Sequence, residues 1–287
     1  MLHRSILGLA TLLTLSGCGV GEIEGYTPSS AITFAAPFRT MAQHDSLMAE
    51  REWPYLVSIP GQGALLYYGS RHINDPDDPQ IADIAARWEA FGPTVAVTEN
   101  RLGWYGGGLD RAVSKHGEFG AVLHLARRDG VPIYTLEPSW EDEVAEVTRA
   151  FPVEEATLFY TLRVFLSERS EGRSADDIDD LAAHLLRKRG SRPGLEGSLP
   201  DLTALDALWN ERFAHFGPWR DLPPEAIHPS PNPTRLQALA NVVNEARDRH
   251  AARIILDFIS QGERVFAIAG GSHVVKQEPV LRAGAER

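Results

Sequence analysis

Short runs of apolar residues alternate along the chain with longer stretches in which apolar residues recur at helical spacing. Four of the runs have the length and continuity of strands that are buried on both faces, as in a parallel sheet. These runs are 65–68, 95–97, 133–136 and 265–269. Alternation of such strands with helices indicates βαβ units. We therefore expect an α/β fold with a mostly parallel central sheet flanked by helices.

The predicted helices between the strands have recognisable ends. Asp78-Pro79 supplies an N-cap carboxylate followed by a proline at the first helical position, and Gly92-Pro93 ends this segment. A second helix is expected over 118–128. A long helix over 234–261 is expected to lead into the last strand.

The middle of the chain follows a different pattern. Residues 140–233 contain helical segments that clusters of proline and glycine separate or follow. The segments are 140–150, 154–170, 175–189 and 201–216. We predict a helical insertion that caps the sheet, within a single α/β domain of residues 53–287.

Composition and charge narrow the class of partner. The chain has 287 residues, 43% of them hydrophobic, and a formal net charge of −11. A negative field opposes the approach of a polyanion, and no basic stripe with interleaved aromatic residues offsets it. Nucleic acid is therefore not expected as a partner.

The N-terminus has the order of a secretory signal: a basic start, an apolar run over 6–15, and then small residues. Leu15-Ser16-Gly17-Cys18 resembles the bacterial lipobox, whose cysteine receives a lipid and becomes the new N-terminus, and this is the chain's one cysteine. A plain secretory signal with a chance cysteine is the alternative.

The lipobox interpretation divides the N-terminal region. Residues 1–17 are expected to be a signal peptide, Cys18 the lipidation site, and residues 18–52 a tether or a disordered N-terminus. The partner implied is a membrane of the cell envelope, reached through the lipid. Gly19 stands where an aspartate would suggest inner-membrane retention, which favours the outer membrane, facing the periplasm.

Each predicted strand ends in polar residues. Two strands run into Gly-x-x-His motifs that end at His72 and His273, and the other two end at Glu99 and Glu137. Ligands of open α/β sheets bind outside the carboxyl ends of the strands. We therefore expect these four side chains to form one polar site, although 201 residues separate the histidines.

Further candidates lie close to these strand ends. Arg247 falls on the apolar stripe of the long helix, so it needs a carboxylate such as Glu99 or Glu137, or else it clamps an anionic substrate group. Asp75 is the favoured orienter of His72. Asp75, Glu118 and Ser272 are secondary site candidates. Glu118 lies in the first turn of its helix, where a favourable interaction with the helix dipole is the structural alternative, and Ser272 lies in a tight turn, where small polar residues are common.

These residues resemble the superfamily of erythromycin esterase-like proteins, TraB/TIKI/GumN-type proteins and ChaN-like haem-binding lipoproteins. The resemblance spans about 60–275 and rests on Gly69-x-x-His72, Glu99, Arg247-Asp248 and Gly270-x-x-His273, in that order. It implies an α/β fold with a central site formed by these residues. TIKI-type members look like metal-dependent proteases, esterase-type members are similar to lactone hydrolases with a water-activating histidine, and ChaN-like members bind haem.

The first hypothesis is therefore a cell-envelope hydrolase, an esterase or a metal-dependent peptidase, acting on a small molecule or peptide. A histidine oriented by a carboxylate would activate water, Glu99 or Glu137 would orient it or act as a second acid or base, and Arg247 would stabilise negative charge. In a metal-assisted version, His72, His273 and Glu99 would bind Mn, Co or Zn.

Two other classes remain open. A non-enzymatic lipoprotein could hold haem or another small ligand through the same histidines, with aromatic side chains of the cap covering it. Those aromatic side chains, at 209, 213, 216 and 219, have core packing as their ordinary role. A structural envelope protein with a decayed site is the third reading.

Overall fold

The computed structural model describes residues 22–29, 31–169 and 174–286, and Cys18 lies outside these ranges. Its centre is a five-stranded sheet in the order β1-β2-β5-β3-β4. The strands are β1 (Tyr55–Ile59), β2 (Ala64–Ser70), β3 (Val95–Thr98), β4 (Ile133–Thr135) and β5 (Arg264–Gly270). Only β1, at one edge, is antiparallel to its neighbour. The predicted mostly parallel sheet is therefore confirmed, with β1 as an additional strand.

The register brings the ends of β2 and β5 together. Ser70 is paired with Gly270, so the chain leaves both strands side by side at the same edge of the sheet. β3 pairs with the other side of β5, with Thr98 opposite Ile268. Residues that follow β2, β3 and β5 therefore meet at the carboxyl edge.

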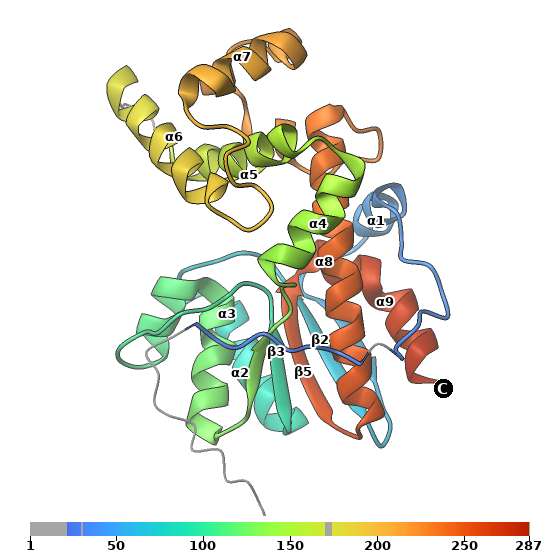
Figure 1. Ribbon diagram of the computed structural model, residues 1–287. Coiled ribbons are helices and arrows are strands. Elements are labelled where there is room, and N and C mark those ends of the chain that lie inside the picture. The colour runs from blue at the N-terminus through green and yellow to red at the C-terminus, as the bar shows by residue number, and fades with distance from the viewer. Residues whose placement is uncertain (1–21, 30, 170–173, 287) are drawn as a thin grey trace, which may run out of the picture.

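Helices cover both faces of the sheet, as expected for an α/β fold (Figure 1). One face is covered by α2 (Pro79–Phe91) and α3 (Leu109–Asp129), and the other by α8 (Arg235–Ser260) and α9 (Gly271–Ala285). Side chains of the strands alternate between the two layers: Tyr67 packs toward α8 and α9, and Tyr68 toward α2 and α3. The bounds of α2 and α8 agree with those expected from their caps.

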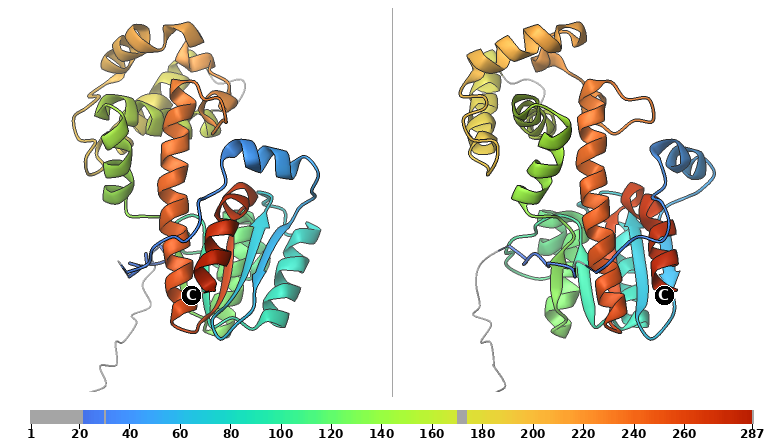
Figure 2. Two further views of the ribbon diagram at one scale, coloured as in Figure 1. Left: turned by 90° about the vertical axis from the view of Figure 1, so that its right-hand side faces the viewer. Right: turned by 45° about the vertical axis from the view of Figure 1, so that its right-hand side comes forward.

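The insertion forms a second helical layer above the carboxyl edge of the sheet (Figures 1 and 2). It comprises α4 (Trp140–Ala150), α5 (Val153–Glu168), α6 (Ala175–Gly190) and α7 (Leu202–Arg212), followed by 3-10 turns at Ala214–Phe216, Trp219–Asp221 and Pro224–Ile227. Its own apolar core includes Trp209, Phe213 and Trp219. These aromatic side chains are thus core residues, while Phe216 is partly buried against the same core.

Helix α8 belongs to both cores. Its first half contributes Leu236, Leu239 and Val243 to the core of the cap. Its second half, from Ala251 onward, packs on the sheet. Arg247 lies between the two apolar stretches, at the level where the sheet ends and the cap begins.

The segment before the domain is packed against it, which corrects the tether expected over 18–52. From residue 22 onward the chain contacts the domain: Tyr26 Oη donates to Asp257 at 2.8 Å, and Gly25 forms a bridge with Thr135. α1 (Met41–Met48) follows, with Thr40 as its N-cap in a capping box with Gln43. Buried contacts of this kind hold an N-terminal segment in place.

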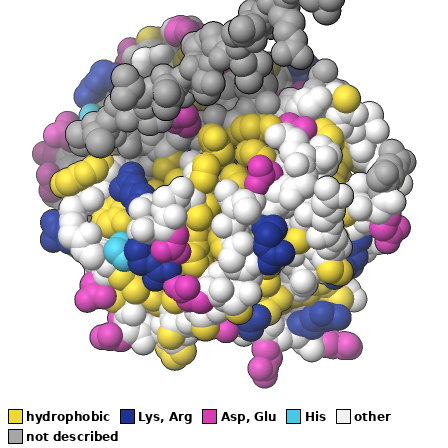
Figure 3. Space-filling model, turned by 90° about the horizontal axis from the view of Figure 1, so that it is seen from below, with side chains coloured by type: hydrophobic (Ala, Val, Ile, Leu, Met, Phe, Trp, Pro, Cys, Tyr) yellow, Lys and Arg dark blue, Asp and Glu magenta, His cyan; other side chains and the backbone are white. Residues whose placement is uncertain are grey.

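The surface away from the cap is of mixed charge. Seen from below, Lys and Arg side chains are interspersed with Asp and Glu and with apolar side chains on the face that is visible (Figure 3). Within the described ranges, no helix has both the length and the apolar character needed to cross a membrane.

Because α8 is one continuous helix through both cores, we expect the cap and the sheet to unfold together. Leu239→Ala in the cap and Ile255→Ala under the sheet remove fully buried side chains, so each should lower the free energy of unfolding by about 2–5 kcal/mol. Urea unfolding followed by far-UV circular dichroism and tryptophan fluorescence should give one coincident transition that both variants shift.

The matched controls are Leu239→Met and Ile255→Val, which should cost less than about 1.5 kcal/mol. Two separate transitions, each moved by only one of the alanine variants, would contradict the coupling.

Candidate functional site

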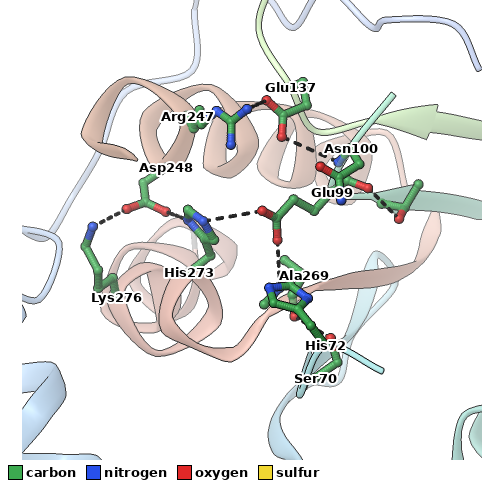
Figure 4. Close-up of polar contacts among 12 residues, drawn as sticks. Ser70, His72, Glu99, Asn100, Glu137, Arg247, Asp248, Ala269, His273 and Lys276 are labelled. Carbon is green, nitrogen blue, oxygen red and sulfur yellow. Dashed lines mark hydrogen bonds and ion pairs between the residues drawn. The ribbon is translucent and has the colours of Figure 1, made fainter. Parts of the chain in front are cut away.

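The carboxyl edge of the sheet brings together the two histidines that the Gly-x-x-His motifs carry. His72 follows β2, and His273 lies in the first turn of α9, which begins directly after β5. The second motif therefore continues into a helix, where a strand end was expected. Glu99, the residue after β3, reaches between the two imidazoles (Figure 4).

Glycines allow these elements to approach one another closely. A Cβ on Gly69 would lie 2.8 Å from the carbonyl oxygen of Tyr55, and one on Gly271 would overlap the ring of Trp53. A Cβ on Gly270 would lie 3.1 Å from His72 Nε2 and 3.3 Å from Glu99 Oε2. Both groups therefore face the backbone of Gly270, which explains the glycine there.

Glu99 is held by α9 and by His273. The backbone N–H of Gly270, at the N-terminus of α9, donates to Glu99 Oε2 at 2.8 Å, and His273 Nε2 lies 3.6 Å from Oε1. Burial would raise the pKa of Glu99, but the charge of His273 and the Gly270 N–H outweigh burial and lower it. Glu99 is therefore an ionised carboxylate.

His72 is oriented by Glu118, which corrects the assignment of Asp75 to that role. Nδ1 of His72 lies 2.9 Å from Glu118 Oε1, while the Ile73 N–H donates to Oε2 at 3.0 Å. Asp75 instead accepts from the N–H of Asp77 in the turn that follows His72. Glu118 can reach His72 because α3 is kinked at Gly117, whose φ is 64°.

The hydroxyl of Ser70 completes this group. It donates to Glu118 Oε1 at 3.0 Å and is buried, so it supports the carboxylate and is not placed as a nucleophile. Ser272 is half-buried in the first turn of α9. Among the described residues its hydroxyl has no hydrogen-bond partner, so its expected secondary role has no contact that supports it.

His273 is oriented by Asp248 in the same way. Its Nδ1 lies 2.6 Å from Asp248 Oδ1, and Gln277 Nε2 donates to that oxygen at 2.8 Å. Lys276 Nζ lies 2.5 Å from Asp248 Oδ2. The charges of His273 and Lys276 overcome burial and lower the pKa of Asp248 to about 2.

The two histidines share a pattern but differ in access to solvent. Each has a buried carboxylate at Nδ1, so each directs Nε2 toward Glu99. The His72 side chain is 68% exposed and that of His273 is 13% exposed. His72 is therefore the histidine that a ligand can reach.

The carboxylates set the pKa values of both imidazoles. The hydrogen bond that His72 Nδ1 donates to Glu118 raises the pKa of His72, against a smaller opposing effect of burial. Burial lowers the pKa of His273, but the charges of Asp248 and Glu99 exceed that effect and raise it. His273 is thus protonated more readily than an ordinary imidazole, because its Nδ1 faces Asp248 and its Nε2 faces Glu99.

Arg247 is occupied by two carboxylates, which corrects its expected role as a substrate clamp. Its Nη2 lies 2.6 Å from Glu137 Oε2, and its Nε donates to Glu143 Oε2 at 3.0 Å. The pair with Glu137 is the structural alternative that the sequence left open. Among the described residues Glu137 pairs with Arg247 and with neither histidine. Burial raises the pKa of Glu137, although the charge of Arg247 opposes this effect.

An open groove of about 570 Å³ leads to His72. Its lining includes the polar side chains of Asn100, Arg101, Lys115 and His116, beside apolar ones such as Phe119. Asn100 has a φ of 71°, a conformation that asparagine tolerates better than most residues, and the chain turns there directly after Glu99. On the other side of Glu99, a cavity of about 10 Å³ between Glu137, Arg247 and His273 has room for about one water molecule.

The side chains expected to bind a metal do not form a ligand set. His72 Nε2 and Glu99 Oε2 both lie against Gly270, and Glu99 already accepts the Gly270 N–H. Across residues 22–29, 31–169 and 174–286, no three His, Cys, Asp or Glu side chains are grouped as metal ligands. We therefore derive no step through a metal ion.

Comparisons of this chain with models of protein families, with curated proteins and with solved structures gave no significant match.

Several residues of the site were not predicted from the sequence. Asp248, Lys276 and Gln277 form the group around His273, and Glu143 is the second partner of Arg247. Asp248 was visible only as the neighbour of Arg247. A signal for Lys276 and Gln277 existed: they follow His273 by three and four residues, which places them on its side of a helix.

Glu118→Gln tests the pairing at His72. The variant keeps a hydrogen-bond partner for Nδ1 but removes the charge that raises the imidazole pKa, while burial continues to lower it. NMR titration of the imidazole should therefore give a lower pKa for His72 in the variant than in the wild type.

Glu225→Gln, an exposed site in the cap, is the control and should leave that pKa unchanged. An equal His72 pKa in the wild type and in Glu118→Gln would show that the carboxylate does not set the protonation of this histidine.

Proposed function

We propose that this protein is a hydrolase in which His72 activates water at the carboxyl edge of the sheet. One observation carries the proposal: His72 has a buried carboxylate at Nδ1, a largely exposed side chain, and an Nε2 that lies close to a second carboxylate, Glu99. A histidine fixed in this way is the ordinary form of a general base.

The neutral form of His72 would do this work. With its Nδ1 proton donated to Glu118, the lone pair lies on Nε2, and the exposed side chain lines the groove. Removing a proton from water would convert His72 to an imidazolium, which the adjacent carboxylates of Glu118 and Glu99 would stabilise. The hydroxide equivalent formed there would add to an ester, lactone or amide carbonyl. The imidazolium would then give its proton to the departing alcohol or amine as the acyl C–O or C–N bond breaks.

His273 is a positioning residue in this proposal. It is nearly buried and lies between Asp248 and Glu99, so it holds Glu99 in place and balances its charge. The polar side chains that line the groove favour a polar substrate. The aromatic side chains of the cap pack in its own core, and this packing does not support the alternative in which they cover haem.

The test is hydrolysis by the full chain of a panel of esters, lactones and peptides. For any substrate turned over, His72→Ala should lower kcat by about 10²- to 10⁴-fold, as expected for loss of a general base. His228→Ala, an exposed histidine of the cap, is the control and should retain full activity. Activity that survives unchanged in His72→Ala would refute the assignment.

The pH dependence has a defined sign. Because neutral His72 is required and its pKa is raised, kcat/KM should fall as pH drops through a value above about 6.5. Glu118→Gln should move this acidic limb to lower pH. An acidic limb at the same pH in both proteins would contradict the role of Glu118.

The cell-envelope location is part of the same proposal and depends on Cys18. The lipobox-like Leu15-Ser16-Gly17-Cys18 supports a lipid anchor in the outer membrane, facing the periplasm. Labelling of a bacterial host with radioactive palmitate should mark the wild type and His228→Ala equally. Cys18→Ser should carry no label, and a labelled Cys18→Ser protein would rule out the anchor.

A further inference from the structure

Three guanidinium groups surround one tryptophan at the junction of sheet and cap. Trp140, the first residue of α4, has Arg192 at 4.0 Å, Arg101 at 4.9 Å and Arg189 at 5.6 Å from its ring centroid. Arg101 follows β3, Arg189 lies in the last turn of α6, and Arg192 lies in the turn after it. Two segments far apart in the sequence, the loop after β3 and the end of α6, thus bring three positive charges together.

Among the described residues, these arginines form no ion pair with a carboxylate, in contrast to Arg220 and Arg247. Arg101 donates to the carbonyl oxygen of Pro138, and the Nε atom of Arg189 is buried without a hydrogen-bond partner. Burial and their mutual repulsion lower the pKa values of Arg189 and Arg192.

The nearest carboxylates do not neutralise the group. Glu143 is already bound by Arg247, and Glu22 and Glu141 act on Arg192 only from beyond ion-pair distance. A cation–π contact is a modest interaction, so it does not account for several clustered cations.

We propose that the arginines around Trp140 bind an anionic group, a carboxylate or a phosphate, of the substrate that reaches His72. Guanidinium groups recognise both oxyanions through paired N–H donors. Arg101 connects the two places, since it lines the groove at His72 and lies over the ring of Trp140. The groove of about 450 Å³ that also contains Arg101 and Trp140 is lined by the carboxylates of Glu22, Glu137, Glu141 and Asp142, so we expect the anion to enter from the groove at His72. The assignment to substrate rests on the proposed hydrolase, whereas anion binding by itself does not.

Thermal unfolding of the full chain tests anion binding without any assay of activity. Buffers of equal ionic strength would contain chloride alone, inorganic phosphate or acetate. Phosphate or acetate should raise the Tm of the wild type in a saturable way, because a ligand that binds the folded state stabilises it. The arm that saturates at the lower concentration identifies the class of anion.

Variants of the cluster give the decisive comparison. Arg192→Gln should bind the anion at least tenfold more weakly, yet melt no lower than the wild type in chloride, because it relieves repulsion. Arg192→Lys keeps the charge but loses the planar donors, so it should show an intermediate response. Arg253→Gln, which removes a single guanidinium from the ring of Phe34, is the matched control and should respond like the wild type.

The outcomes separate the two levels of the proposal. Absence of a saturable response in the wild type, an unchanged response in Arg192→Gln, or a Tm of that variant in chloride well below the wild type would overturn the anion site. On a hydrolysed substrate, Arg192→Gln should raise KM for an anionic compound and leave that of its neutral analogue unchanged. Equal KM values would overturn only the assignment to substrate. A His72-independent activity would overturn the proposed hydrolase and, with it, the assignment to substrate, whereas anion binding would stand.

Discussion

A buried carboxylate on α8 is the constraint around which this site is built. Asp248 lies where the apolar core of the sheet gives way to that of the cap, and its side chain is 1% exposed. Burial of an unpaired carboxylate costs several kcal/mol, so this position requires partners from another element. The first turns of α9 supply them: His273, Lys276 and Gln277 all contact Asp248. Pairing of this charge therefore fixes α9 against α8 and, with it, the orientation of His273.

The same rule of paired charge extends across the carboxyl edge. His273 directs Nε2 toward Glu99, which also accepts the N–H of Gly270, the N-cap of α9. The N-terminus of this one helix therefore positions both His273 and Glu99. Glu118 does for His72 what Asp248 does for His273, through the kink that precedes it in α3. Arg247 serves the cap in a similar way by binding one carboxylate from the β4–α4 connection and one from α4 itself. The ionic contacts are thus structural and leave only His72 broadly exposed.

Local sequence patterns were sufficient for much of the fold. Continuous apolar runs predicted β2, β3, β4 and β5, since a strand covered by helices on both faces has no polar side. Caps and helical periodicity predicted α2, the second part of α3 and α8. The short edge strand β1, the helix α1 and the helix that follows β5 were not predicted. The segment before residue 53 was taken for a tether because its composition is that of a loop, whereas its order comes from contacts with α8, β4 and α9.

The sequence by itself determined that His72, Glu99 and His273 lie at one edge, because parallel strands end at the same side of a sheet. It could not determine which carboxylate serves which histidine. Asp75 is close to His72 in sequence, but Glu118 is its partner in space, and Asp248 meets His273 only because α8 and α9 pack side by side. Strand order decided that β2 lies beside β5, and helix packing decided that Arg247 binds Glu137 and Glu143. Such pairings depend on distances between elements, and periodicity along one chain carries no information about them.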